Sequence, residues 1–237
     1  MEERVIRGAK RQTICRVMCT VLLALGMSGQ LAAQTKANQP GTAKSAVTKT
    51  AAPRAMAVPA DITALKALGS KSAPITMQVF SDFQCPACRE LYFSVVRNVI
   101  DNYVSAGKVY LIHRDMPLPM HPHSRIAARY ANAAAVARRM EKVVAVLFEK
   151  QPVWAADGNV DGTVAAVLTP AEMNQVRKLV NSGTLEPGID KDFALGTEFR
   201  VTQTPTTIIT YKGTNYPVVG VVSYSMMKTF LEQLLRQ

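Results

Sequence analysis

Two cysteines separated by two residues are the side chains in this sequence best suited to chemistry. Cys85 and Cys88 lie in the stretch SDFQCPACRE, where a β-rich apolar run gives way to a predicted helix. A pair at this spacing can ligate a metal, form a structural disulfide or act as a redox centre. Closing so short a loop removes little entropy from the unfolded chain, which argues against a purely structural bridge.

Metal binding is the main chemical rival. His121 and His123 could join Cys85 and Cys88 as ligands, but the H-x-H spacing fits zinc sites poorly and a second C-x-x-C is missing. Thiolate and imidazole also suit copper. We therefore predict no metal or other cofactor, and we keep a copper-carrying module as an alternative.

The predicted start of a helix favours redox chemistry at this pair. There Cys85 would face unpaired backbone N–H groups and the positive end of the helix dipole, which stabilise a thiolate. Pro86 suits the first helical position, and Cys88 follows one turn along, close enough to close a disulfide. We expect Cys85 to be the exposed nucleophile and Cys88 the shielded resolving thiol.

The elements around the pair predict an α/β domain. β-rich runs at 75–80 and 108–113 flank a predicted helix from Pro86 to about Ser105, which makes a β-α-β unit with parallel strands. The Ala-rich stretch from Ser124 to about Lys150 then predicts one broken helix or two. His113 is predicted to be a strand-edge residue.

Further helices and a hairpin complete the domain. Thr169-Pro170-Ala171-Glu172 predicts a capped start for a helix to Ser182, and a further helix is expected at 187–199. Strands at 206–211 and 216–221 are expected to flank a turn at 212–215. A last helix, capped by Ser223, should follow with one apolar face.

This order of elements resembles the DsbA-like thiol-disulfide oxidoreductases of the thioredoxin superfamily. The matching stretches are FSDFQCPACREL, LIHRDMPLPMHPHSRIAARYA and VTQTPTT. The resemblance implies a thioredoxin-like fold over residues 61–237, with an α-helical insertion at about 119–200 between the β-α-β and β-β-α halves. It also implies that Pro86 and Ala87 tune the redox pair, that Pro205 is a cis-proline, and that Thr204 before it binds client proteins.

Two positions depart from the family pattern. The strongest oxidases of the family carry a histidine before the second cysteine, whereas this chain has Ala87, so we expect an oxidant of intermediate strength. Many members also place a buried acid where this chain has Val79. Asp82 and Glu90 are nearby, but nothing in the sequence justifies substituting either for it.

The N-terminal residues predict export. Residues 1–33 have a basic start, an apolar run and a small-residue end, as in a signal peptide or, if retained, a membrane anchor. Residues 34–60 are rich in Ala, Thr, Lys and Pro, which predicts a flexible tether. Cys15 and Cys19 lie in the leader, so the mature chain would keep only the C-x-x-C pair. We expect a periplasmic or otherwise extracytoplasmic location.

The charge distribution excludes one class of partner. The formal net charge is +11, but most of the excess lies in the first 60 residues, and no basic stripe with interleaved aromatics follows. Nucleic-acid binding is therefore not expected. The expected partners are reduced or unfolded exported client proteins and, by the family resemblance, a quinone-coupled thiol oxidase in the membrane.

We therefore predict an exported thiol-disulfide oxidoreductase that oxidises client cysteines by exchange through Cys85 and Cys88. A reductase or isomerase of the same fold is one alternative. A non-enzymatic module that carries copper or binds clients is the other.

Overall fold

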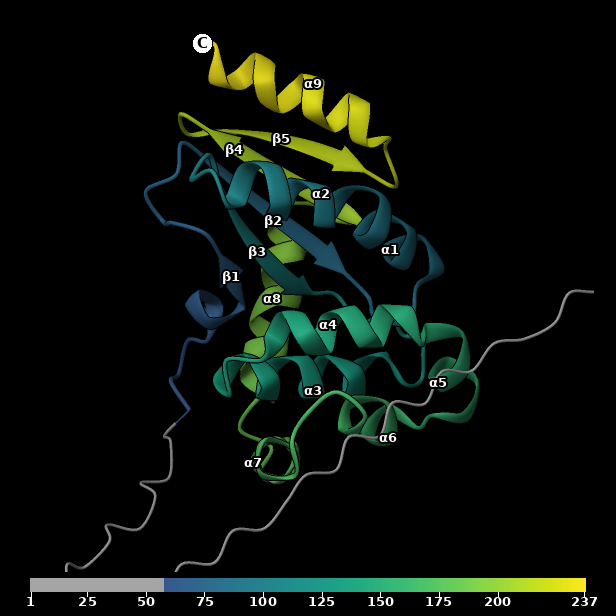
Figure 1. Ribbon diagram of the computed structural model, residues 1–237. Coiled ribbons are helices and arrows are strands. Elements are labelled where there is room, and N and C mark those ends of the chain that lie inside the picture. Colours follow the sequence, from purple (N-terminus) through teal and green to yellow (C-terminus); the bar gives the residue numbers. More distant parts are fainter. Residues whose placement is uncertain (1–57) are drawn as a thin grey trace, which may run out of the picture. The chain divides into compact units, whose positions relative to one another are not determined.

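The computed structural model describes residues 58–237, so the predicted leader and nearly all of the predicted tether lie outside the described residues. Figure 1 shows the arrangement of the elements. The strands are β1 (Ala67–Leu68), β2 (Ile75–Ser81), β3 (Val109–Asp115), β4 (Thr206–Tyr211) and β5 (Thr214–Val219). The α-helices are α1 (Pro86–Leu91), α2 (Arg97–Val99), α3 (Ser124–Val136), α4 (Met140–Glu149), α5 (Gln151–Asp157), α6 (Val160–Ala165), α7 (Pro170–Asn181), α8 (Glu186–Glu198) and α9 (Tyr224–Leu235). A 3-10 helix, η1 (Thr63–Lys66), and two π-helical segments, η2 (Tyr92–Val96) and η3 (Ile100–Val104), complete the set.

The five strands form one sheet in the order β1-β3-β2-β4-β5. β2 and β3 are parallel, with Ile75 opposite Val109, as the predicted β-α-β unit requires. β4 runs antiparallel to β2 on its other side, and β5 closes the sheet as an edge strand. β5 is mostly exposed and contains Pro217, whose missing N–H suits an edge strand.

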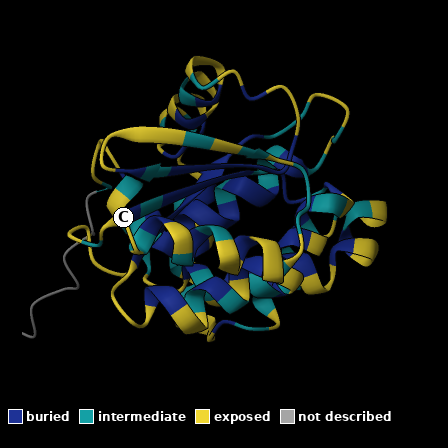
Figure 2. Ribbon diagram, turned by 90° about the horizontal axis from the view of Figure 1, so that it is seen from above, coloured by how far each residue is buried: buried dark blue, intermediate teal, exposed yellow. Residues whose placement is uncertain are grey.

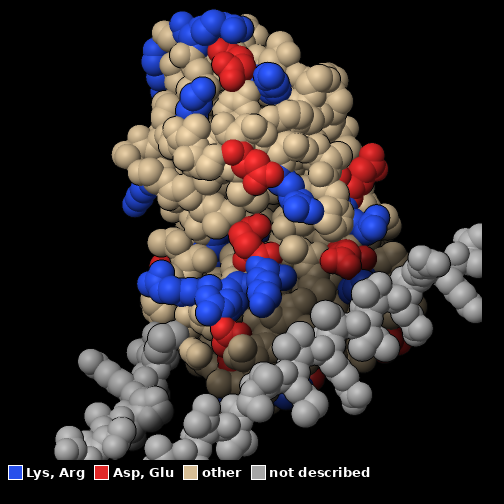
Figure 3. Space-filling view, viewed as in Figure 1, with Lys and Arg blue, Asp and Glu red and all other residues tan. Residues whose placement is uncertain are grey.

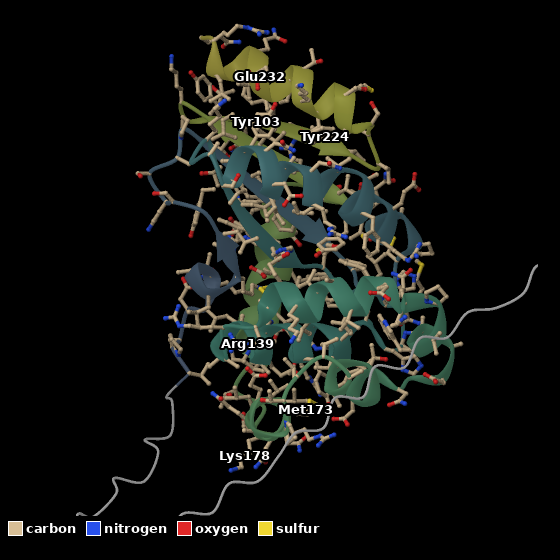
Figure 4. All side chains as sticks on the ribbon, viewed as in Figure 1. Tyr103, Arg139, Met173, Lys178, Tyr224 and Glu232 are labelled. Carbon is tan, nitrogen blue, oxygen red and sulfur yellow. The ribbon has the colours of Figure 1, made fainter. Side chains whose placement is uncertain are left out.

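Helices cover both faces of the sheet. The segments α1, η2, α2 and η3 form one continuous helical run from Pro86 to Val104, as predicted, which lies on one face together with α9 (Figure 1). The hydroxyl of Tyr103 in this run donates to Glu232 of α9 at 2.8 Å, and both residues lie in the upper part of Figure 4. α8 covers the opposite face, where Asp192 pairs with Arg114 of β3.

Helices α3 to α8 lie between β3 and β4 in the chain, so the fold is the predicted thioredoxin-like α/β fold with a helical insertion. The Ala-rich stretch forms two helices, which separate where Arg138 takes a positive φ of 57°. Thr169 caps α7, and the Glu172 side chain completes the capping box. Trp154 is fully buried within the insertion, where its Nε1–H donates to the carbonyl of Leu147 at 2.6 Å.

Two details of the prediction are wrong. The β4–β5 turn contains only Lys212 and Gly213, both with positive φ, so β5 begins at Thr214 inside the predicted turn. His113 is not at a sheet edge, because β3 lies between β1 and β2, and only 7% of the residue is exposed.

A buried ionic cluster fixes the segment that enters the domain. The ammonium of Lys66 contacts the carboxylates of Asp115, at 2.6 Å, and Asp192. Burial disfavours the charged lysine, but the two carboxylates outweigh burial and raise the pKa of Lys66. The side chain of Asn132 in α3 also donates to Asp115. Strand β3 and the helices α3 and α8 are therefore joined to η1 at one buried point.

The surface and interior follow the usual division. Figure 2 shows buried residues along the sheet and on the inward sides of the helices. Lysine and arginine side chains gather in the lower part of Figure 3 with acidic side chains beside them. Arg139, labelled in Figure 4, pairs with Glu172 at 2.5 Å. Among residues 58–237, no helix has both the length and the apolar character needed to cross a membrane.

Candidate active site

The two cysteines lie at the start of the helical run. Cys85 is the N-cap residue of α1 with an extended backbone, Pro86 occupies the first turn, and both thiols are free. Cys88 lies one turn along, and its N–H donates to the carbonyl of Cys85 at 3.1 Å. The solvent-exposed fraction is 8% for Cys85 and 2% for Cys88. The expected order of accessibility is present, but Cys85 is far less exposed than the sequence predicted.

The protein environment shifts the pKa values of the two cysteines in opposite directions. Four hydrogen-bond donors stabilise the Cys85 thiolate: the Cys88 thiol, the Thr204 side chain and the backbone N–H groups of Cys88 and Ala87. Together they outweigh burial and lower the pKa of Cys85 to about 5. Burial, followed by the neighbouring Cys85, raises the pKa of Cys88 well above its usual range. At neutral pH, Cys85 is therefore a thiolate while Cys88 keeps its proton.

The loop before β4 faces Cys85. The Thr204–Pro205 peptide bond is cis, as predicted, and the carbonyl of Thr204 lies 3.5 Å from Cys85 Sγ. Within residues 58–237, the buried Thr204 hydroxyl has no hydrogen-bond partner while Cys85 is a thiol. It can donate to this sulfur once Cys85 is a thiolate, which is how it lowers the pKa of Cys85. In the described part of the chain, the backbone N–H and carbonyl of Thr204 make no hydrogen bond to another backbone group.

The helical insertion holds the other side of the C-x-x-C loop. The Gln151 side chain is buried, and its Nε2 donates to the carbonyls of Phe83 at 2.7 Å and Cys85 at 3.0 Å. Gln84 bridges to the insertion as well, since it accepts from His123 N and donates to the carbonyl of Ala155. The sequence offered no signal for Gln151, which lies 66 residues from Cys85.

The Asp82 side chain, which the sequence could not assign, is buried behind the loop. Its carboxylate accepts hydrogen bonds from Gln84 N, Leu118 N and His121 Nδ1 at 2.7, 2.7 and 2.8 Å. The bond to Gln84 is a local Asx turn that a sequence can indicate. The bond to His121 crosses 39 residues and has no local signal. Glu90 is exposed on the helix surface.

Val79 is buried, with a polar cluster beside it on the neighbouring strand. His113 lies opposite Val79 in the parallel pair, and its Nε2 is 2.6 Å from Glu141 of α4. The Tyr92 hydroxyl, which belongs to the helical run, donates to the same carboxylate at 3.4 Å. His113 outweighs burial and lowers the pKa of Glu141. The polar groups of this cluster therefore come from β3, the insertion and the helical run, and Thr207 of β4 lies opposite Val79 on its other side.

The four candidate metal ligands do not form one cluster. His121 pairs with the buried Asp82, and the ring of His123 lies against Gly158. Within residues 58–237, no group of three or more histidine, cysteine or acidic side chains is arranged to hold a metal ion.

Comparison with known proteins agrees with the fold. Residues 63–232 match the family model described as Thioredoxin. α-DsbA1 from Wolbachia pipientis superimposes with a TM-score of 0.61 at 21% identity, covering 71% of this chain and 89% of that chain. BdbD from Bacillus subtilis gives the same TM-score and identity, covering 73% of this chain and 93% of that chain.

The curated relatives match over shorter segments. The probable disulfide bond formation protein D of Bacillus cereus is 36% identical over 52 residues, which is 22% of this chain and 24% of that protein. The Na(+)/H(+) antiporter NhaA 3 of Salinispora tropica is 35% identical over 79 residues, covering 33% of this chain and 12% of that protein. The matched part of this chain thus spans a quarter or less of the length of these relatives.

Proposed function

We propose that this chain, which belongs to the thioredoxin family and has a DsbA-like fold, is an exported thiol-disulfide oxidoreductase that oxidises cysteines of client proteins. The observation that carries the proposal is the asymmetry of the pair. Cys85 has a pKa lowered to about 5, next to a buried Cys88 that keeps its proton. Such a difference suits one thiol to be the exchanging nucleophile and the other to be the resolving thiol.

The oxidation proceeds by two exchanges. A client thiolate attacks Cys85 Sγ of the oxidised protein, the Cys85–Cys88 bond breaks, and Cys88 leaves and takes up a proton. A second client thiolate then attacks the client sulfur of the mixed disulfide and releases Cys85 as a thiolate. The client loses two electrons and gains a disulfide, while the protein gains the two electrons and is reduced.

The lowered pKa of Cys85 supports this direction of exchange. A stabilised thiolate favours the reduced protein, which makes its disulfide more oxidising. Ala87 supplies no further positive charge before Cys88, so we expect a potential between those of thioredoxin, about −270 mV, and DsbA, about −120 mV.

Client docking is proposed at the loop that faces Cys85. The backbone groups of Thr204 have no backbone partner among the described residues, and the carbonyl of Thr204 lies 3.5 Å from Cys85 Sγ. An extended client segment can pair with Thr204 through its own backbone, which requires little sequence specificity. The buried hydroxyl of Thr204, which helps to lower the pKa of Cys85, is then available to the exchanging Cys85 sulfur.

The reduced protein needs an external electron acceptor. Only Cys85 and Cys88 remain in the chain after loss of the predicted leader, so a second internal pair cannot accept the electrons. By analogy with the DsbA-like family we propose a quinone-coupled thiol oxidase in the membrane as this acceptor. That partner implies a periplasmic or otherwise extracytoplasmic location.

Refolding of a reduced, disulfide-containing client protein tests the proposal. We expect the oxidised full chain to restore client activity and Cys85→Ser to abolish this effect. In Cys88→Ser, Cys85 is first converted to a glutathione mixed disulfide with oxidised glutathione, and we expect a client thiolate to displace glutathione and leave a client mixed disulfide on Cys85. A Cys15→Ser/Cys19→Ser variant is the matched control and should refold the client like the original chain. Unchanged refolding in Cys85→Ser would contradict the proposal, and stoichiometric metal that is lost in this variant would favour the copper-carrying alternative.

A further inference from the structure

Asp82 connects both cysteines to a loop on the far side of the active site. It follows β2 directly, at the end of the sheet where α1 begins and where β3 leads toward α3 (Figure 1). Only 1% of the residue is exposed. We propose that Asp82 is a positioning residue for Cys88, and that its bond to His121 sets the rate at which Cys88 resolves a mixed disulfide. The inference rests on the proposed function, because attack of Cys88 on a mixed disulfide is the reverse of the first exchange described there.

The backbone of Asp82 faces both sulfur-bearing residues. Its N–H points to Cys88 Sγ at 3.4 Å, and its carbonyl accepts the N–H of Cys85 at 3.1 Å. When Cys88 attacks, it must do so as a thiolate, and burial opposes that charge. The Asp82 N–H is one of the few donors that reach this sulfur, so its direction matters for the attack.

The Asp82 carboxylate fixes the orientation of the Asp82 backbone N–H and carbonyl. It accepts from three donors on two chain segments: Gln84 N on the C-x-x-C loop, and Leu118 N and His121 Nδ1 on the loop before α3. An ionised carboxylate is acceptor-only and satisfies all three donors. An asparagine cannot do so, because its amide nitrogen would face a backbone or ring N–H in either orientation.

His121 is the accessible end of this connection. Its side chain is 19% exposed, whereas the carboxylate that it contacts is fully buried. Replacing His121 therefore removes one donor at the protein surface and leaves Asp82 and both cysteines in place. His123, two residues along, is the matched control, because its contact with Gln84 is made by the backbone and survives a side-chain change.

The test measures only the step in which Cys88 attacks a mixed disulfide on Cys85. The full chain is loaded with glutathione as a mixed disulfide on Cys85, and the release of glutathione by Cys88 is measured against pH. Iodoacetamide alkylation of Cys85 in the reduced chain is measured in parallel. Far-UV circular dichroism of each variant reports whether it is folded.

We expect His121→Ala to release glutathione about tenfold more slowly at neutral pH and to shift the half-maximal release to higher pH. The alkylation rate of Cys85 should change by less than about twofold, since its main donors are Cys88, Thr204 and the helix start. His121→Gln can still donate one hydrogen bond to Asp82 and should recover most of the rate. His123→Ala should match the original chain.

Asp82→Asn separates positioning from charge. If the carboxylate acts by positioning, the asparagine slows release as His121→Ala does. If its negative charge merely opposes the Cys88 thiolate, the neutral side chain speeds release, and this result would overturn the inference. Release at the original rate in His121→Ala would overturn it as well. A failure of the original chain to release glutathione at all would instead contradict the proposed function.

Discussion

The two sides of Cys85 are held in different ways. Toward the helical insertion, the loop is fixed by the two hydrogen bonds from buried Gln151, by the Gln84 bridge and by Arg89, whose Nε donates to the Phe148 carbonyl at 2.9 Å. Toward the loop before β4, the closest polar contact is 3.5 Å long, and the Thr204 hydroxyl remains without a partner among the described residues.

The insertion side therefore positions the Cys85 thiol, and the Thr204 side is left for thiol-disulfide exchange. Buried polar groups normally have hydrogen-bond partners, and an exception calls for an explanation. On the insertion side the groups are satisfied, which keeps the thiol geometry constant. On the Thr204 side the unused groups are the ones that a thiolate or an extended client could use, as the proposed function requires.

The largest expected effect is on the insertion side. Gln151→Leu keeps the size of the side chain but leaves the buried carbonyl of Phe83 without this donor, and weakens the bonding of the Cys85 carbonyl. We expect the free energy of unfolding of the reduced chain to fall by about 2 kcal/mol, measured by urea denaturation. Gln233→Leu, at an exposed position of α9, should change it by less than about 0.5 kcal/mol. Equal effects would show that Gln151 does not hold the loop.

Thr204→Val tests the side of Cys85 that faces the loop before β4. It removes the hydroxyl that helps to lower the pKa of Cys85, so that pKa should rise by about one unit, which corresponds to about 1.4 kcal/mol. The pH dependence of Cys85 alkylation measures this shift. Thr207→Val is the control, because its hydroxyl in β4 is also buried without a partner but does not contribute to the pKa of Cys85. A similar shift in both variants would contradict a specific role for Thr204.

The smallest effect is expected at Arg89. Arg89→Met removes the bond to the Phe148 carbonyl, but the Arg89 side chain is only partly buried, and Gln151 and Gln84 still hold the loop. The free energy of unfolding should therefore fall by less than about 1 kcal/mol, as followed by urea denaturation. Arg97 also lies over the Phe93 ring, so Arg97→Met controls for the loss of this stacking. A loss above about 2 kcal/mol would mean that Arg89 is a main support of the loop.

Local sequence patterns predicted the parts of the site that depend on neighbouring residues. The C-x-x-C at a helix start, the capping box at Thr169 and Glu172 and the parallel β-α-β unit all follow from spacing within a short stretch. The family resemblance added the cis bond before Pro205.

The missed features depend on residues far apart in the chain. Gln151 and His121 reach the C-x-x-C loop across 66 and 39 residues, and neither residue type identifies its partner. The low exposure of Cys85 likewise follows from the packing of the Thr204 loop, which the order of elements does not define. The turn at Lys212 was misplaced because a lysine with positive φ is uncommon.

The redox potential of the Cys85–Cys88 pair as a function of pH tests the central claim most directly. With Cys85 ionised above pH about 5 and Cys88 protonated, reduction takes up one proton for two electrons, so the potential should fall by about 30 mV per pH unit above that break and by about 59 mV below it. At pH 7 it should lie between about −270 and −120 mV. A potential near that of thioredoxin, with an unbroken slope of about 59 mV up to neutral pH, would contradict an oxidase built on a stabilised Cys85 thiolate.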